Sequence, residues 1–210
     1  MNPNGNLDSL PTLSKPSKPL APTAISTYKD SQRRVAEIAS RATLNDPLNV
    51  LFQREKTSPL TPVTAMQLYG ACMACISRRI AAGAFVVEAA GFAAVACWEL
   101  PQSTPPDLPE ETIDKLFARE GRPIYAPFLR DLQVARCEVL GSHTRFWSLS
   151  SMARDPNRKA KGAVRAVIQL LVARARAESL PLWLVAANER ARDVYAYFGF
   201  RVVKVPEEFC

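Results

Sequence analysis

The sequence predicts an α/β fold with a mixed central sheet flanked by helices. The last part of the chain carries this prediction, because strand, helix, strand, helix and strand patterns follow one another from residue 144 onward. Further upstream, two short apolar runs, Phe85–Ala89 and Phe92–Trp98, are separated by Ala90-Gly91, which is typical of a hairpin. Helical patterns precede the hairpin, so strands and helices alternate within one domain.

The composition is that of a single globular domain with a real core. The chain has 210 residues, of which 48% are hydrophobic and 22% charged. Residues 1–24 are rich in proline and hold no apolar segment, so we expect a flexible tail without a secretory signal. The domain is expected over 25–210, with a helical insertion at about 102–141. The net charge of +7 is compatible with a phosphate-bearing ligand or with nucleic acid.

Cysteine and histidine usage excludes several classes of site. The five cysteines lack the spacing of a disulfide framework, and we interpret them as small thiols in a reducing, cytoplasmic compartment. Cys72 and Cys75 form a C-x-x-C, but no second pair accompanies it, which argues against zinc. His143 is the only histidine, so a multi-histidine metal site is excluded and no metal is expected.

The stretch Ile80–Trp98 has two interpretations. Its nineteen residues are enough to span a bilayer, and they carry a single charge. Glu88 near the middle and the pair Ala90-Gly91 favour the hairpin instead, and no membrane partner is expected.

Before the hairpin, the sequence predicts three helices. Apolar spacing indicates the first over 30–43, and Asp46-Pro47 restarts a short helix over 48–53. The third is expected to open at Thr61-Pro62 and to run to about Ala82.

Two further helices are expected in the insertion after the hairpin. One begins at Pro109 or Glu110 and ends near Ala118, after a proline-rich loop, and the other covers about 123–139.

The last elements of the predicted sheet follow the insertion. A strand ends near Arg154, with four side chains predicted to share one face: Trp147, Leu149, Ser151 and Ala153. A helix over 162–179 precedes a nearly all-apolar strand at 181–187, which is expected to be buried on both faces. Asn188 then caps a helix that ends at Gly199, and a final strand is predicted over 200–205.

The loop before the 162–179 helix is unusually basic. Arg158, Lys159, Lys161 and Arg165 crowd a helix N-terminus, which is already electropositive. A pyrophosphate held by the loop amides would turn these repelling cations into ligands. The alternative is a solvated basic loop with no ligand.

From about Phe146 to Val205 the sequence resembles the Gcn5-related N-acetyltransferase (GNAT) superfamily. The stretch "KAKGAV", residues 159–164, matches the family's coenzyme loop, and "NERARDVYAYFGF", residues 188–200, matches its more specific C-terminal motif. The sequence is most similar to the fungal and actinomycete branch with puromycin acetyltransferase-like proteins. "DPLN" at residue 46 and the Trp98 to Pro101 ending of the hairpin are shared with that branch.

The resemblance implies a mainly antiparallel sheet and direct transfer of an acetyl group from acetyl-CoA to the amine of a small molecule. The backbone of Met152, Ala153 and Arg154 would pair with the pantetheine arm. Pyrophosphate binding would fall to the loop, through amides and charges of the following residues: Arg158, Lys159, Ala160, Lys161, Gly162, Ala163 and Val164.

Catalytic roles follow from the same resemblance. Tyr195 would be the general acid that protonates the leaving thiolate, or else a tyrosine that packs its helix onto the sheet. Glu99 is a candidate base, or an exposed rim carboxylate. Asn188 is either a coenzyme contact or a plain helix cap. We expect a monomer or homodimer that does not bind nucleic acid.

The sequence also departs from the family pattern. Val164 stands where the family has glycine or alanine, and a β-branched side chain there can obstruct the pyrophosphate. Few residues follow the predicted last strand, so the sheet is expected to lack one strand unless a neighbouring chain supplies it. Two alternatives therefore remain: a degenerate GNAT-fold protein with weak or no CoA binding, and a basic nucleic-acid- or membrane-associated module.

Overall fold

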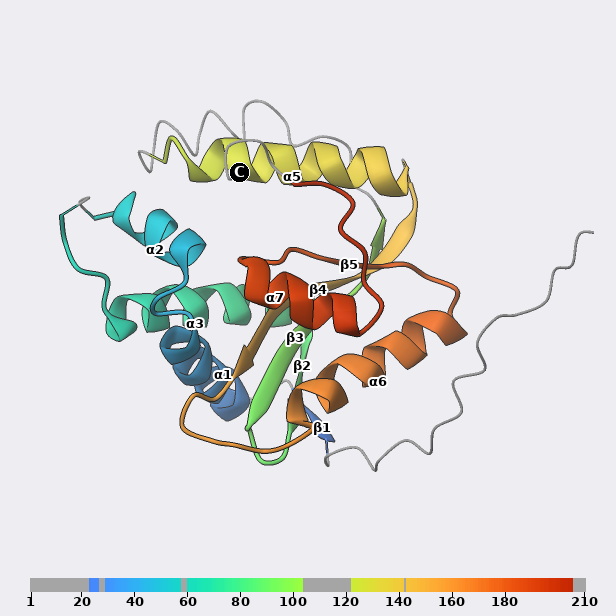
Figure 1. Cartoon of the computed structure of the whole chain (residues 1–210), viewed down its shortest axis with the longest axis horizontal. Coiled ribbons are helices and arrows are strands. Elements are labelled where there is room, and N and C mark those ends of the chain that lie inside the picture. The colour runs from blue at the N-terminus through green and yellow to red at the C-terminus, as the bar shows by residue number, and fades with distance from the viewer. Residues whose placement is uncertain (1–22, 27–28, 58–59, 104–121, 142, 206–210) are drawn as a thin grey trace, which may run out of the picture.

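The computed structural model describes residues 23–26, 29–57, 60–103, 122–141 and 143–205. It confirms an α/β fold built on a mixed five-stranded sheet (Figure 1). The strands lie in the order β1 (Thr23–Ser26), β2 (Phe85–Ala89), β3 (Ala94–Ser103), β4 (Arg145–Arg154) and β5 (Leu182–Leu184). The described helices are α1 (Lys29–Ala42), α2 (Pro47–Arg54), α3 (Ala65–Ala81), α5 (Tyr125–Leu140), α6 (Ala163–Ala177) and α7 (Glu189–Tyr197).

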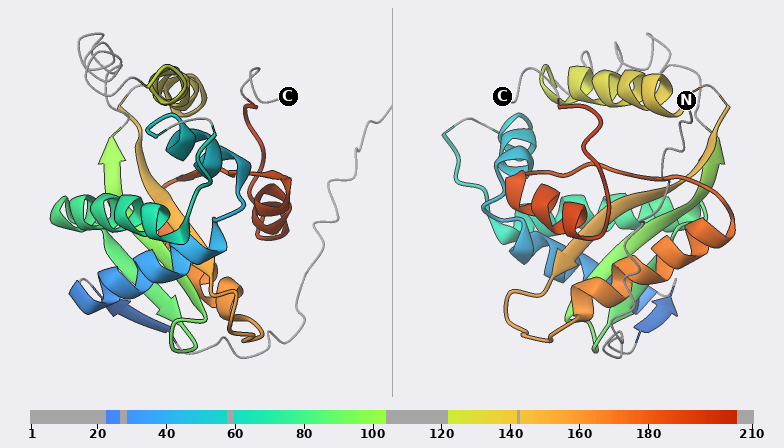
Figure 2. Two further views of the ribbon diagram at one scale, coloured as in Figure 1. Left: turned by 90° about the vertical axis from the view of Figure 1, so that its left-hand side faces the viewer. Right: turned by 45° about the vertical axis from the view of Figure 1, so that its right-hand side comes forward.

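The sheet is antiparallel from β1 to β4, and only β4 and β5 run parallel. It separates two helical layers, with α1 and α3 on one face and α6 and α7 on the other (Figure 2). One core forms between α1, α3 and residues such as Val86 and Val95. The larger core lies under α6 and includes Trp98, Trp147 and Val167. Because both faces of the sheet are covered, its central strands are apolar on both sides.

The predicted hairpin is confirmed. β2 has the predicted bounds, whereas β3 begins at Ala94 and continues past Trp98 to Ser103. The connection uses three residues with positive φ, Ala90, Gly91 and Phe92. Glu88 closes the turn, because its carboxylate accepts a hydrogen bond from the Phe92 N–H at 2.7 Å. Residues 80–98 are therefore not a membrane helix, and none of the described helices is both long and apolar enough to cross a bilayer.

Two boundaries in the N-terminal half differ from the prediction. Thr23 and Ala24, predicted to belong to the flexible tail, form β1 with the next two residues and pair with β2. The third helix is capped by Thr64 instead of Thr61. Thr64 and Gln67 form a capping box, in which each side chain accepts a hydrogen bond from the other residue's backbone N–H.

The insertion is described only in part. The helix predicted over 123–139 is confirmed as α5, which lies across one end of the sheet and packs on Phe146 and Trp183 (Figure 1). The proline-rich loop and the helix predicted to end near Ala118 lie outside the described residues.

A bulge in β4 overturns the predicted alternation of its side chains. Leu149 is opposite Trp98 and Ser151 is opposite Cys97, so Ser150 is an extra residue in β4. Its hydroxyl donates to the Cys97 carbonyl at 3.0 Å. The extra residue reverses the faces beyond it. Trp147 and Leu149 therefore join the α6 core, whereas Ala153 packs on the α1 side.

The C-terminal elements agree with the prediction up to Gly199. The helices at 162–179 and after Asn188 are present as α6 and α7, and β5 is a shorter version of the strand predicted at 181–187. The last predicted strand is wrong, because residues 201–205 form no strand. They run toward α5 instead, where the Lys204 Nζ lies 2.7 Å from a Glu138 carboxylate oxygen.

Candidate functional site

The parallel strands β4 and β5 stay paired over only a short length. Trp147–Leu149 pairs with Leu182–Leu184, and β4 then continues to Arg154 while β5 ends. Met152 and Arg154 pair with β3 on their other side, opposite Ala96 and Ala94. Within the described chain, no strand pairs with the β5-facing edge of β4 beyond Leu149. That edge is available to an extended molecule that carries amide groups.

The loop after β4 ends in a glycine that starts α6. Gly162 is the N-cap with φ of +84°, and a Cβ placed on it would meet no atom within 4 Å. Several backbone N–H groups at this helix start have no acceptor among the described residues: those of Lys159, Ala160, Lys161, Gly162, Val164 and Arg165. Free amides at a helix N-terminus with open space beside them form a suitable anion site.

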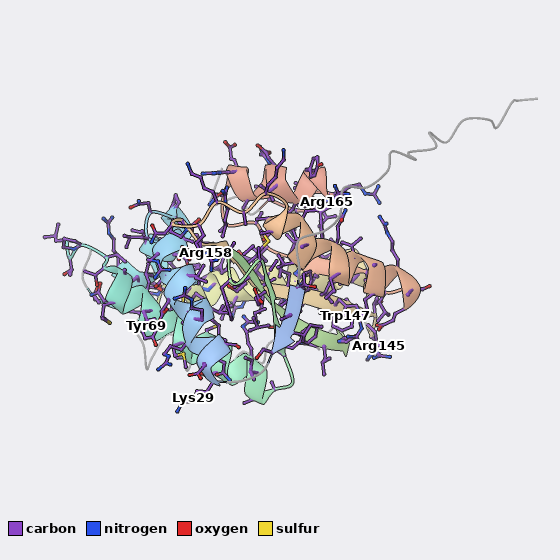
Figure 3. All side chains as sticks on the ribbon, turned by 90° about the horizontal axis from the view of Figure 1, so that it is seen from below. Lys29, Tyr69, Arg145, Trp147, Arg158 and Arg165 are labelled. Atoms are coloured by element: carbon purple, nitrogen blue, oxygen red, sulfur yellow. The ribbon has the colours of Figure 1, made fainter. Side chains whose placement is uncertain are left out.

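The cations of the loop are not equivalent. Arg158 lies on the loop and Arg165 on the first turn of α6 (Figure 3). The Arg158 guanidinium donates to the Gly91 carbonyl in the β2–β3 turn, so it holds the loop against the hairpin. Arg165 donates to Gln169 at 2.9 Å. Lys159 and Lys161 are exposed and have no ion-pair partner in the described part of the chain.

The side chain of Val164 packs toward the protein interior. It is half-buried and lies against the main core cluster with Ala163 and Val167. Ala160, in the middle of the loop, packs on the same cluster. The loop is thus anchored by its small apolar residues, while Lys159 and Lys161 extend to solvent.

Tyr195 lies on α7 and is 7% exposed. Its ring makes an edge contact with Phe200, with centroids 5.8 Å apart. Burial raises the pKa of its hydroxyl to about 12. The described residues provide no hydrogen-bond partner for this hydroxyl. At neutral pH Tyr195 therefore keeps its proton. Tyr195 also lines a cavity.

The cavity has a volume of about 990 Å³ and lies between α2, α5, β5, α7 and residues 200–205. Most of its lining is apolar and includes Leu48, Leu51, Phe128, Leu132, Trp183 and Tyr195. Charged groups also contribute, with Asp131 on α5 and Arg201 near the C-terminus. A cavity of this size and character accommodates a small, partly apolar molecule.

Glu99 does not line this cavity. Its carboxylate forms an ion pair with Arg79 of α3 and accepts a hydrogen bond from Gln102 at 2.7 Å. α3 packs on the face of the sheet opposite α6 and α7. The structure therefore does not bring together the two residues predicted to be catalytic, Glu99 and Tyr195.

Asn188 caps α7, as one of its two interpretations predicted. Its Oδ1 accepts the Ala191 N–H at 2.9 Å, and its Nδ2 donates to Asp46 at 2.5 Å. Asp46 is the N-cap of α2 and accepts the Asn49 N–H with its other oxygen. Asn188 therefore links the first turns of α7 and α2, on two sides of the cavity.

Sequence reasoning missed Asp155, the first residue after β4. It is buried, and its Oδ1 accepts the Asn157 N–H at 3.0 Å. The Asp-Pro-Asn run was a usable signal, because an aspartate often caps the amide two residues later in a turn. No cluster of histidine, cysteine or acidic side chains in the described residues could hold a metal ion.

No family model matches the sequence. Two curated yeast proteins are similar over part of their length. An uncharacterized Saccharomyces cerevisiae protein is 30% identical over 118 residues, which are 55% of this chain and 46% of that protein. A putative increased recombination centers protein from the same yeast is 33% identical over 79 residues, 37% of this chain and 51% of the relative. The chain spans about half the length of the curated relatives it matches.

Solved structures are similar over nearly the whole chain. A histone acetyltransferase HPA2 and related acetyltransferase from Corynebacterium glutamicum superimposes with a TM-score of 0.60 at 18% identity, covering 90% of this chain and 89% of the other. A Drosophila melanogaster polyamine N-acetyltransferase superimposes with a TM-score of 0.55 at 12% identity, covering 87% of this chain and 85% of the other. A mosquito arylalkylamine N-acetyltransferase-like protein superimposes with a TM-score of 0.56 at 11% identity, with the same coverage of both chains. The chain therefore has the GNAT acetyltransferase fold.

Proposed function

We propose that this protein transfers an acetyl group from acetyl-CoA directly to the amine of a small molecule. The separation of β4 from β5 beside the free amides of the α6 start carries the proposal. The edge of β4 is left for the pantetheine arm, and the loop that follows β4 provides an anion site for the diphosphate. The fold is shared with N-acetyltransferases, which supports the same reaction class.

The residues present fit acetyl-CoA as a co-substrate. Along Met152–Arg154, the backbone groups that alternate onto the β5-facing edge of β4 would pair with the pantetheine amides. The free amides of residues 159–165, which exclude that of Ala163, would hold the diphosphate, and there is open space beside Gly162. Lys159 and Lys161 add charge, whereas Arg158 is bound to Gly91 and contributes through the shape of the loop.

Acetyl-CoA supplies an acyl group activated as a thioester. In the proposed reaction the amine nitrogen forms a bond to the acyl carbon, the carbon–sulfur bond breaks, and the ammonium proton leaves to water. The Tyr195 hydroxyl, which burial keeps protonated, donates its proton to the departing thiolate. The tyrosine is then reprotonated from water, which has taken up the ammonium proton. We assign Glu99 no catalytic role, since it is paired with Arg79 outside the cavity.

The cavity beside Tyr195 is the proposed acceptor site. Its volume of about 990 Å³ and its leucine, phenylalanine and tryptophan lining suit an amine on an apolar body. We expect such amines to be better acceptors than the lysine side chains of protein tails, and steady-state rates with a panel of both classes measure the difference.

A degenerate GNAT-fold protein without transferase activity is the alternative. One observation favours it: Arg158, a cation of the loop, is already occupied by the Gly91 carbonyl, which leaves fewer charges for a diphosphate. Titration calorimetry with CoA separates the two candidates. Micromolar affinity supports the enzyme, and the absence of measurable binding supports the alternative.

Charge reversal at the loop should weaken coenzyme binding. Lys161→Glu is expected to raise the Kd for CoA about tenfold at low salt, because it places a negative charge beside the proposed diphosphate. Arg176→Glu is the matched control, since Arg176 is exposed near the other end of the same helix. Calorimetry should show no comparable change for it. Equal effects of the two variants would mean that only net charge matters and that the loop is not the site.

A further inference from the structure

Asp155 fixes the loop at its start through three hydrogen bonds. Its own N–H donates to the Ala93 carbonyl at 3.0 Å, and its carbonyl accepts the Arg158 N–H at 3.2 Å. Its Oδ1 accepts the Asn157 N–H at 3.0 Å. The residue is 3% exposed, so these bonds are shielded from water. Asp155 thus sets the path of the chain between β4 and the amides at the start of α6.

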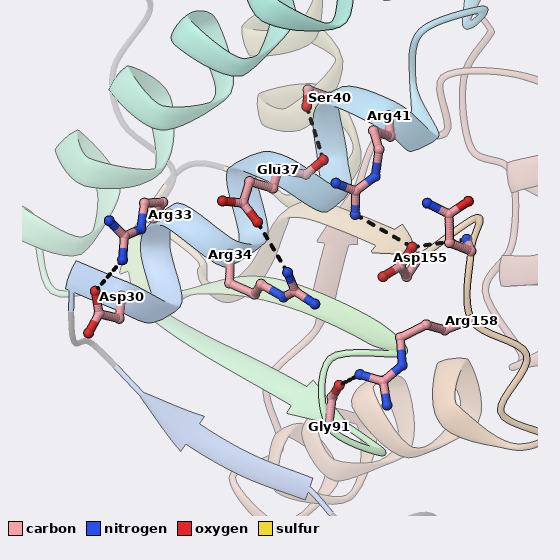
Figure 4. A network of polar contacts seen from close by, with 10 residues as sticks. Asp30, Arg33, Arg34, Glu37, Ser40, Arg41, Gly91, Asp155 and Arg158 are labelled. Atoms are coloured by element: carbon pink, nitrogen blue, oxygen red, sulfur yellow. Dashed lines mark hydrogen bonds and ion pairs between the residues drawn. The ribbon is translucent and has the colours of Figure 1, made fainter.

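Arg41 supplies the opposite charge from a different layer of the protein. It lies in the last turn of α1, and its Nη2 is 3.5 Å from the Asp155 Oδ1 (Figure 4). The Arg41 Nε is buried and has no acceptor among the described residues. Among the described residues, the ion-pair partner of this guanidinium is the buried Asp155 carboxylate.

The position of Asp155 creates an electrostatic conflict with the proposed ligand. Asp155 is four residues before Lys159, where the proposed diphosphate site begins. A buried carboxylate near that site repels a diphosphate strongly, because charges inside proteins are weakly screened. Its hydrogen bond to Asn157 nevertheless helps to shape the loop. A nearby cation resolves the conflict, since it removes the repulsion without removing the acceptor.

We propose that Arg41 and Asp155 are a positioning pair for the coenzyme loop. Asp155 holds the loop in the shape that presents its amides, and Arg41 cancels the charge of Asp155. The inference rests on the proposed function, in which residues 159–165 bind the diphosphate of CoA. It predicts that α1, although outside the coenzyme site, controls coenzyme affinity.

The test is a double-mutant cycle with CoA binding measured by calorimetry. Arg41→Met should raise the Kd for CoA about tenfold, because Asp155 is then uncompensated. Asp155→Asn should leave the Kd unchanged or lower it, since the amide oxygen still accepts the Asn157 N–H and Arg41 becomes a free cation. The double variant should return to within about threefold of the wild type. Arg34→Met, on the same helix and paired only with Glu37 in the described chain, is the control and should change nothing.

A second readout separates coenzyme positioning from a purely structural role. Acetyl-pantetheine lacks the diphosphate, so Arg41→Met should lower kcat/KM with acetyl-CoA and leave kcat/KM with acetyl-pantetheine unaltered. A structural ion pair predicts the opposite sign for Asp155→Asn, namely weaker CoA binding. That result, or an unchanged Kd in Arg41→Met, overturns the inference while leaving the proposed function standing. Failure of the wild type to bind CoA overturns both. If Arg41→Met does not fold, the sign of the Asp155→Asn effect still decides.

Discussion

Replacement of Tyr195 by phenylalanine is expected to lower kcat about a hundredfold with little change in the KM for acetyl-CoA. The substitution removes one hydroxyl and keeps the ring that packs on Phe200. A proton donor acts only when the thiolate leaves, so its loss should affect the chemical step more than binding. Steady-state kinetics with acetyl-CoA and a small apolar amine measure both parameters.

The raised pKa of Tyr195 gives this prediction a pH dependence. Burial moves the pKa from 10.0 to about 12, so the hydroxyl stays protonated in the folded protein across neutral and mildly alkaline pH. The wild-type rate should therefore show no loss from this group below about pH 10. In the unfolded chain the proton leaves first, so the contribution of Tyr195 to stability is complete below pH 10 and disappears as the pH rises through 12.

Tyr197→Phe is the matched control. Tyr197 lies on the same helix but is 77% exposed, and we expect its variant to keep the wild-type kcat. Should Tyr195→Phe also retain full activity, Tyr195 would be a packing residue, and the proton would have to come from another donor.

Replacement of Glu55 by alanine is expected to lower the free energy of unfolding by about 3–5 kcal/mol. The Glu55 side chain is 2% exposed, and its carboxylate forms an ion pair with the buried Arg122 at 3.2 Å. The same carboxylate accepts the N–H groups of Ile124 and Tyr125, where α5 begins. Alanine therefore removes a charged partner of the buried Arg122 guanidinium and takes acceptors away from the start of α5. Urea unfolding followed by tryptophan fluorescence measures the loss.

Two variants calibrate the Glu55 result. Asp30→Ala removes an exposed carboxylate paired with Arg33, and such surface pairs contribute little, so its unfolding midpoint should stay near that of the wild type. Glu55→Gln keeps an acceptor for the α5 amides and should destabilise less than alanine. A wild-type midpoint for Glu55→Ala would show that this buried pair does not hold α2 to α5.

Local signals in the sequence predicted the elements whose ends are determined by neighbouring residues. Asn188 and Gly199 bound α7 because a side-chain cap and a positive φ of +90° are local requirements. The Ala90-Gly91 hairpin and the glycine before α6 follow the same rule. The basic loop could therefore be proposed as a site from its local charge pattern, whereas Tyr195 was proposed from the resemblance of residues 188–200 to the GNAT motif.

Contacts between distant residues could not be predicted in this way. The bulge at Ser150 depends on pairing with β3, and it moved Ala153 to the other face of the sheet. The strand predicted at 200–205 had suitable β-branched residues, but a strand also needs a partner, and this segment runs toward α5 instead. A local pattern contains no information about which partner is within reach.

The sequence by itself determined the order of helices and strands, the caps, and the concentration of positive charge before α6, because each depends on residues within a few positions of one another. Only the tertiary structure decided which partners the charged side chains have. It bound Arg158 to the hairpin turn, placed Glu99 on Arg79, and brought Arg41 to Asp155. The first pairing joins two connections of the sheet, and packing of α3 and α1 against the sheet makes the other two residue pairs neighbours.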